Sequence, residues 1–153
     1  MAELEIIGPQ DLPALLAISN PEALEGTRRT LAEMGYKVHA AENQEEFENR
    51  YNRVTYQIVV LEETFANGNL LENPTLRWVQ NLPMSQRRDA TIFLLGESLE
   101  TLNALQAFSL SVHCVINYNE FHMLAELIHK TVAENELFLT TYREAQRRAA
   151  QKS

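Results

Sequence analysis

The sequence feature that most constrains the fold is the unbroken apolar run Ile58-Val59-Val60-Leu61, which lies between Gln57 and the pair Glu62-Glu63. Four consecutive apolar residues, most of them β-branched, are typical of a strand that is buried on both faces. Such strands form the parallel sheets of α/β proteins, in which ligand-binding and catalytic residues follow the carboxyl ends of the strands. The two carboxylates after this run are therefore the first candidates for a functional site.

Similar short runs recur along the chain and alternate with helical patterns. We predict strands at Ala14–Ile18, Tyr36–Ala40, Gln57–Leu61, Thr91–Leu95 and His113–Ile116. Helices are predicted after the capping residues Asn20, Asn43, Asn73, Ser98 and Asn119, and the last of them runs to about Ala145. Strands that alternate with helices over short connections form βαβ units with right-handed crossovers. The sequence therefore predicts a three-layer α/β fold, with a doubly wound parallel five-stranded sheet and an extended C-terminal helix.

The length of 153 residues fits one domain. We predict an N-terminal extension at residues 1–13, the α/β domain at 14–133 and a helical C-terminal extension at 134–153. A short additional strand at Leu4–Ile7 is consistent with the pattern, although Pro9 and Pro13 interrupt any longer element.

Composition excludes several classes of function. The net charge of −8 disfavours binding to nucleic acid and to anionic membranes. No apolar stretch approaches the roughly 18 residues of a membrane helix, and no signal-peptide pattern begins the chain, so we expect a cytoplasmic protein. The single cysteine, Cys114, and four scattered histidines give no metal-site spacing. We expect no metal, no cofactor and no catalytic residue.

The pattern of strands and of strand-end residues resembles that of the response-regulator receiver (CheY-like) domain, over roughly Ala14 to His129. The resemblance implies the flavodoxin-like strand order 2-1-3-4-5. In that family, acidic residues after the first strand hold Mg²⁺, and an Asp after the third strand accepts the phosphoryl group. A Thr or Ser follows the fourth strand and a Lys follows the fifth. The corresponding positions here are Ser19, Asn20, Glu62, Gly96 and Asn117, with Tyr118 as the alternative at the fifth strand.

Nearly every reactive position of this pocket departs from the family pattern. Mg²⁺ requires carboxylate ligands, which Ser19 and Asn20 do not supply. Phosphoryl transfer to a carboxylate also requires cations that neutralise the negative charge on the transferred oxygens. The family's lysine is replaced here by Asn117. The resemblance therefore implies a degenerate pseudo-receiver without the phosphoacceptor Asp. Its expected function is a non-catalytic, phosphorylation-independent protein-protein interaction module in bacterial-type signal transduction.

Two interpretations of Glu62 remain open at this point. In the first, which we favour, Glu62 points to solvent at the strand end, as such carboxylates commonly do. In the second, Glu62 is hydrogen-bonded to Ser19 or Asn20 and mimics a modified state. Two further functions are alternatives: a phospho-accepting receiver that uses Glu62, and a flavodoxin-like domain that binds a small molecule or nucleotide above Ser19, Glu62 and Gly96. A metal cluster of Glu62, Glu63 and Glu97 is disfavoured because no His or Asp accompanies it.

The last helix carries a long apolar stripe that needs a partner. Its candidate interface residues are Phe121, Leu124, Ile128, Phe138 and Tyr142. Either a second copy of the chain covers the stripe, as a homodimer through the C-terminal helix, or the helix folds back over Leu4–Ile7. The resemblance places the recognition face on the fourth helix, fifth strand and fifth helix. The expected partners are other proteins, or other domains of a signalling protein.

Overall fold

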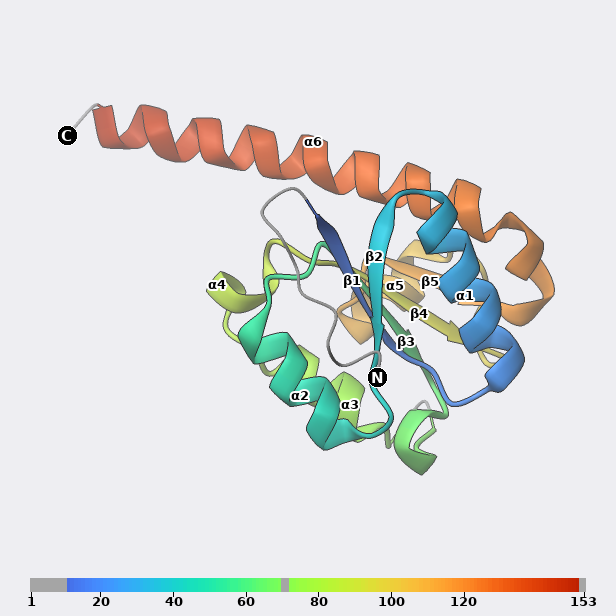
Figure 1. The fold of residues 1–153 in the computed structure, drawn as a ribbon. Helices are drawn as coiled ribbons and strands as arrows, with labels where there is room; N and C mark the ends of the chain where they lie inside the picture. Colours follow the sequence, from blue (N-terminus) through green and yellow to red (C-terminus); the bar gives the residue numbers. More distant parts are fainter. Residues whose placement is uncertain (1–10, 70–71, 152–153) are drawn as a thin grey trace.

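A computed structural model describes residues 11–69 and 72–151, and it contains a five-stranded sheet in the order β2-β1-β3-β4-β5 (Figure 1). All four strand pairings are parallel. The strands are β1 (Leu12–Ala17), β2 (Tyr36–Ala40), β3 (Ile58–Glu62), β4 (Thr91–Gly96) and β5 (Cys114–Asn117). The predicted sheet, its strand order and its doubly wound topology are confirmed.

Helices cover both faces of this sheet. They are α1 (Pro21–Glu33), α2 (Gln44–Arg53), α3 (Pro74–Gln80), α4 (Met84–Arg87), α5 (Ala104–Leu110) and α6 (Leu124–Gln151), with the 3₁₀ helices η2 (Phe65–Asn67) and η3 (Tyr118–Met123). Buried residues of α1 and α6 pack with one face of the sheet, and those of α2, α3 and α5 pack with the other. Because successive strand residues point to opposite faces, β1, β3, β4 and β5 each contribute to both cores, and this explains their unbroken apolar runs.

Most helix boundaries follow from local hydrogen bonding. The side chains of Asn20, Asn43 and Asn73 accept hydrogen bonds from the first-turn N–H groups of α1, α2 and α3, as predicted. Gly35 has a φ of 95°, which favours glycine and ends α1 at the predicted place.

Several boundaries differ from the prediction, three of them at the start of an element that leads to or from the site. The strand β1 begins at Leu12 rather than Ala14, so the predicted start of the domain falls inside a strand. The helix expected to open at Ser98 begins instead at Ala104, because Asn103 provides the cap. The final helix begins at Leu124, after a 3₁₀ helix that Asn117 caps.

The last helix, α6, is longer than predicted and extends beyond the edge of the sheet (Figure 1). Its middle section is attached to the domain. Leu139 is buried, Asn135 donates a hydrogen bond to the Thr91 hydroxyl at 2.9 Å, and Arg143 pairs with Asp89 at 3.0 Å. The predicted strand at Leu4–Ile7 lies outside the described residues. None of the helices in the described ranges has an apolar stretch long enough to cross a lipid bilayer.

Candidate functional site

The two carboxylates that follow the central strand lie inside the protein. Glu62, the last residue of β3, is 0% exposed, and Glu63 is 6% exposed. The interpretation in which Glu62 points to solvent is therefore wrong. A buried carboxylate is costly unless hydrogen-bond donors compensate its charge, so the contacts of these two residues define the site.

Glu62 connects the loops that follow β1 and β5. Its Oε1 atom accepts hydrogen bonds from the backbone N–H groups of Ser19, at 2.6 Å, and Asn20, at 3.1 Å. Its Oε2 atom accepts a hydrogen bond from the Tyr118 hydroxyl. Hydrogen bonds to a charged acceptor are stronger than those between neutral groups, so the three donors stabilise the buried carboxylate. The hydrogen bonds expected in the second interpretation of Glu62 are present, although the donors of Ser19 and Asn20 are backbone groups rather than side chains.

Glu63 turns toward the loop after β4. Its Oε1 atom accepts hydrogen bonds from the N–H of Glu97, at 2.9 Å, and from the N–H and hydroxyl of Ser98, at 3.2 and 3.3 Å. The absence of a side chain at Gly96 creates the space for this carboxylate, because a β-carbon there would overlap the Glu63 side chain. The Glu63 side chain can adopt this position only because residue 96 is a glycine. The family position that holds a Thr or Ser is here filled by a neighbour's carboxylate.

Asn73 fixes the turn in which both carboxylates begin. Its Nδ2 atom donates to the carbonyl oxygens of Glu62 and Glu63, each at 3.0 Å, while its Oδ1 atom caps α3. The side chain is buried. Both hydrogen bonds hold the backbone of the two glutamates against the start of α3, so their side chains diverge from a rigid turn.

The end of β5 carries two uncharged side chains, Asn117 and Tyr118, and no cation. Asn117 donates from Nδ2 to the carbonyl oxygens of Glu97, at 3.1 Å, and Leu99, at 2.8 Å. Partial burial raises the pKa of Tyr118 above its ordinary value, and the bond to Glu62 raises it further. Tyr118 therefore stays protonated and donates its hydroxyl hydrogen at neutral pH. Glu62 therefore accepts a hydrogen bond from the uncharged Tyr118 side chain, close to the position where the resemblance implies a lysine.

This donor set does not fit Mg²⁺. The Asn20 side-chain oxygen accepts from the N–H groups of Glu22 and Ala23, and the Glu62 oxygens already have three donors. Among the described residues, no group of three or more His, Cys, Asp or Glu side chains could hold a metal ion. Hard divalent cations need several free oxygen ligands, and the oxygens of Asn20 and Glu62, at the positions where the family binds Mg²⁺, are already engaged by N–H and O–H donors.

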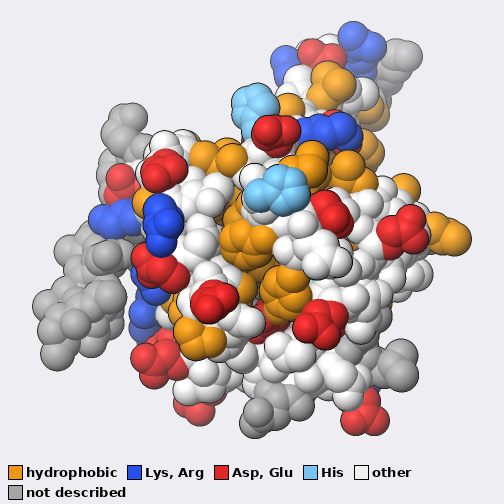
Figure 2. Space-filling view, turned by 90° about the vertical axis from the view of Figure 1, so that its right-hand side faces the viewer, with side chains coloured by type: hydrophobic (Ala, Val, Ile, Leu, Met, Phe, Trp, Pro, Cys, Tyr) orange, Lys and Arg blue, Asp and Glu red, His pale blue; other side chains and the backbone are white. Residues whose placement is uncertain are grey.

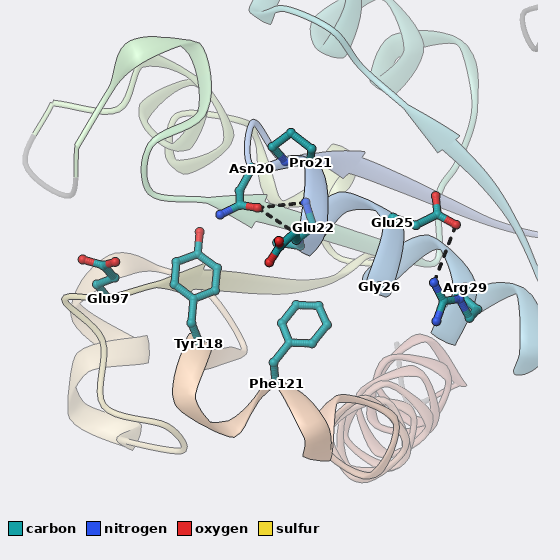
Figure 3. Close-up of a pocket in the computed structure, with 10 residues that line it drawn as sticks. Asn20, Pro21, Glu22, Glu25, Gly26, Arg29, Glu97, Tyr118 and Phe121 are labelled. Carbon is teal, nitrogen blue, oxygen red and sulfur yellow. Dashed lines mark hydrogen bonds and ion pairs between the residues drawn. The ribbon is translucent and has the colours of Figure 1, made fainter.

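A groove of about 790 Å³ lies beside the site, between α1 and η3. Figure 3 shows Tyr118 directed toward Asn20 and the ring of Phe121 directed toward Gly26. On this side of the molecule, hydrophobic side chains gather near the centre and acidic side chains lie around them (Figure 2). The predicted site residue Asn20 lines the groove, but Glu62 and Gly96 do not.

The five candidate interface residues do not form one surface. Leu124 and Ile128 are 2% and 0% exposed, because they pack in the core beneath α6, so their assignment to an interface is wrong. Phe121 faces α1, and its ring packs against Gly26, where a β-carbon would lie only 2.9 Å from the ring. Phe138 is 63% exposed and stacks on Tyr142. Among the five predicted residues, Phe138 is the most exposed to a partner, and Phe121 lines the groove beside Tyr118.

Sequence reasoning located Ser19, Asn20, Glu62, Gly96 and Asn117 at one edge of the sheet, and the structure brings them there. It missed the roles of Glu63 and Tyr118, which complete the site. The sequence signal for Glu63 was Gly96 at the end of the neighbouring strand, because a glycine there leaves room for a side chain from β3. For Tyr118, it was the ambiguity of one residue at the end of the fifth strand.

The fold has clear relatives among solved structures. A putative response regulator from Chloroflexus aurantiacus matches with a TM-score of 0.65 at 14% identity, covering 81% of this chain and 99% of that chain. A CheY-like receiver domain from Methanospirillum hungatei matches with a TM-score of 0.65 at 13% identity, covering 83% and 98%. The chemotaxis response regulator CheY4 of Vibrio cholerae matches with a TM-score of 0.58 at 13% identity, covering 82% and 99%.

No protein-family model matches the sequence, and no curated protein matches it. The chain therefore has the fold of response-regulator receiver domains, at sequence identities of 13 to 14% to the three structures named above.

Proposed function

We propose that this chain is a pseudo-receiver, a receiver-like domain that acts in signal transduction through protein contacts and without accepting a phosphoryl group. The observation that carries the proposal is the buried carboxylate of Glu62, which is bound by three donors from the loops after β1 and β5. These loops are held together by the chain's own side chain. The domain therefore keeps one arrangement of its crest, meaning the edge where the strands end, and needs no modification to reach it.

A phospho-accepting receiver is the less favoured alternative. A carboxylate that attacks phosphorus must present a free oxygen to the donor, in line with the leaving group. Both oxygens of Glu62 are engaged, and the side chain is fully buried. A flavodoxin-like ligand site above Ser19, Glu62 and Gly96 is disfavoured for a related reason, since the carboxylates of Glu62 and Glu63 and the ring of Tyr118 lie there.

The recognition face of this proposal comprises α5, β5 and α6, and it carries exposed apolar side chains. Leu105 and Phe108 on α5 are 78% and 83% exposed, and Leu137 and Phe138 on α6 are 70% and 63% exposed. Large exposed apolar side chains that lie close together commonly mark a protein-binding surface. The expected partners are other proteins or other domains of a signalling protein.

A homodimer through α6 is a narrower form of the same proposal. The net charges along the described part of this helix favour it: the first half carries Glu126, Glu134 and Glu136 with Lys130, and the second carries Arg143, Arg147 and Arg148 with Glu144. Antiparallel pairing of two copies would bring opposite charges together around Leu137. We expect sedimentation equilibrium to show a dimer that dissociates at high salt and in Leu137→Glu. A monomer at all concentrations would exclude this form.

The function itself is tested with Mg²⁺ and beryllofluoride, an anion complex that mimics a phosphoryl group on a carboxylate. We expect the amide spectrum of the ¹⁵N-labelled protein to remain unchanged when both are added, because both oxygens of the acceptor-position carboxylate, Glu62, already accept hydrogen bonds. A receiver domain that responds to both reagents serves as the positive control. Saturable shifts of the Ser19, Glu62 and Glu97 amides would contradict the proposal.

A further inference from the structure

A second cleft lies between α4, α5 and α6, away from the crest. Its volume is about 400 Å³. The apolar side chains that line it include Met84, Phe108, Phe138 and Leu139. Met84, Phe108 and Phe138 are largely exposed, whereas Leu139 is buried and forms part of the floor. The cleft thus has a fixed floor and aromatic walls that stand in solvent.

The charge around this cleft is opposite to that of the whole protein. Arg87 and Arg88 line it, and no Asp or Glu does. His113 also lines it but adds no charge at neutral pH, because burial lowers its pKa and its Nδ1 atom accepts a hydrogen bond from the N–H of Ile92. The chain carries 21 acidic and 13 basic residues, and the groove beside Tyr118 is lined by three glutamates. A cleft without a carboxylate on a protein of net charge −8 is a local basic region that attracts anionic partners.

The two arginines are positioned by contacts that leave them facing the cleft. Arg88 lies over the ring of Tyr142, with its guanidinium carbon 4.8 Å from the ring centre. Arg87 donates to the carbonyl oxygens of Val79 and Gln80, each at 3.4 Å. In neither contact is the positive charge of the arginine paired with a carboxylate. A carboxylate from a partner would supply the missing opposite charge and form charge-assisted hydrogen bonds.

We propose that this cleft binds an acidic amphipathic helix of another protein, with apolar side chains between Phe108 and Phe138 and carboxylates against Arg87 and Arg88. The inference rests on the proposed role in protein interaction and names the chemistry of the partner. Apolar anchors at helical spacing in a groove, with charges at the rim, are a common mode of peptide recognition. Leu105, which is exposed on α5 three residues before Phe108, extends the apolar surface beyond the cleft.

A second copy of the chain fits this cleft less well. A two-fold axis through the cleft would place Arg87 and Arg88 opposite their own copies, and like charges in contact oppose association. The homodimer considered above uses Leu137, which does not line the cleft. The two contacts are therefore separable by substitution.

The test is a selection from a phage-displayed library of random peptides about 15 residues long, enough for four helical turns. The full chain is the target, and a Phe108→Ala, Phe138→Ala double variant is the counter-target. We expect the surviving peptides to be net negative, with apolar residues at i, i+3 or i+4, and i+7. Their affinity should fall about tenfold or more in Phe108→Ala or in Arg88→Glu.

Matched controls are Leu137→Ala and Arg148→Glu, which change an exposed apolar residue and an arginine of α6 outside the cleft. Both should bind the selected peptides within about twofold of wild type. Circular dichroism verifies that every variant is folded. Survivors that are net positive, survivors that bind the double variant equally well, or no survivors at all would each overturn the inference. The response to beryllofluoride is measured separately, so a failure here leaves the pseudo-receiver proposal to its own test.

Discussion

Replacing Gly96 by alanine is expected to destabilise the protein by about 3–5 kcal/mol, one of the largest effects of any conservative change in this chain. The new β-carbon would overlap the side chain of Glu63, which three hydrogen bonds hold in place. Displacing this carboxylate would leave the N–H groups of Glu97 and Ser98 without their acceptor. Chemical denaturation measures the effect as a change in the free energy of unfolding.

The double variant Gly96→Ala, Glu63→Ala identifies the cause. Because the alanine at 63 removes the overlapping atoms, we expect the two changes together to cost less than the sum of the single changes. Gly35→Ala is the comparison without overlap: a β-carbon there meets nothing within 4 Å, so its cost comes from backbone strain at a φ of 95° and should not change when Glu63→Ala is added. Additive costs in the double variant would show that Gly96 is required for some other reason.

Replacing Glu62 by alanine is expected to cost about 2–4 kcal/mol, whereas Glu62→Gln should cost only about 1 kcal/mol. Alanine removes the acceptor of the Ser19 and Asn20 N–H groups and leaves a cavity beside Tyr118. Glutamine keeps the shape: its oxygen accepts from the same two N–H groups, and its amide donates to the Tyr118 oxygen. Thermal unfolding of both variants gives the order of stability.

Glu97→Ala provides the matched control, because Glu97 lies at the same edge of the sheet with an exposed side chain. Its expected cost is within about 0.5 kcal/mol. Equal stability of Glu62→Ala and Glu97→Ala would mean that the hydrogen bonds of Glu62 contribute nothing, and the proposed role of this residue would fail.

The sheet was predictable because buried parallel strands have an unmistakable pattern. The runs at Val59, Leu94 and Val115 are apolar on both faces, and the alternation with helices leaves few topologies. Three asparagine caps were equally clear, since each precedes a helix and accepts its first-turn N–H groups. The order of the strands came from the resemblance rather than from the pattern.

The orientation of side chains at the crest was not predictable in the same way. A glutamate at a strand end usually lies in solvent, and nothing local indicates that the N–H groups of Ser19 and Asn20 converge on Glu62 from a distance of more than forty residues. The start of α5 was mispredicted for a similar reason. The hydroxyl of Ser98 bonds to Glu63, and that of Thr101 accepts from the N–H of Asn117, so neither caps the helix.

The exposed apolar residues of α5 and α6 show the limit of periodicity. Leu105, Phe108 and Phe138 lie on helices at positions that a pattern alone cannot assign to the core or to an interface, whereas Ile128 at similar spacing is buried. Spacing of three or four residues along a helix indicates that apolar side chains lie on the same face of that helix. Whether another chain covers that face depends on tertiary structure.

The most direct test of the central claim is the intact mass of the protein after incubation with a small acyl phosphate and Mg²⁺. The claim is that Glu62 closes the crest with its own hydrogen bonds and does not accept a phosphoryl group. The account predicts an unchanged mass for wild type under conditions in which an authentic receiver domain is modified. A stable mass increase of one phosphoryl group in wild type that is absent from Glu62→Gln would contradict it.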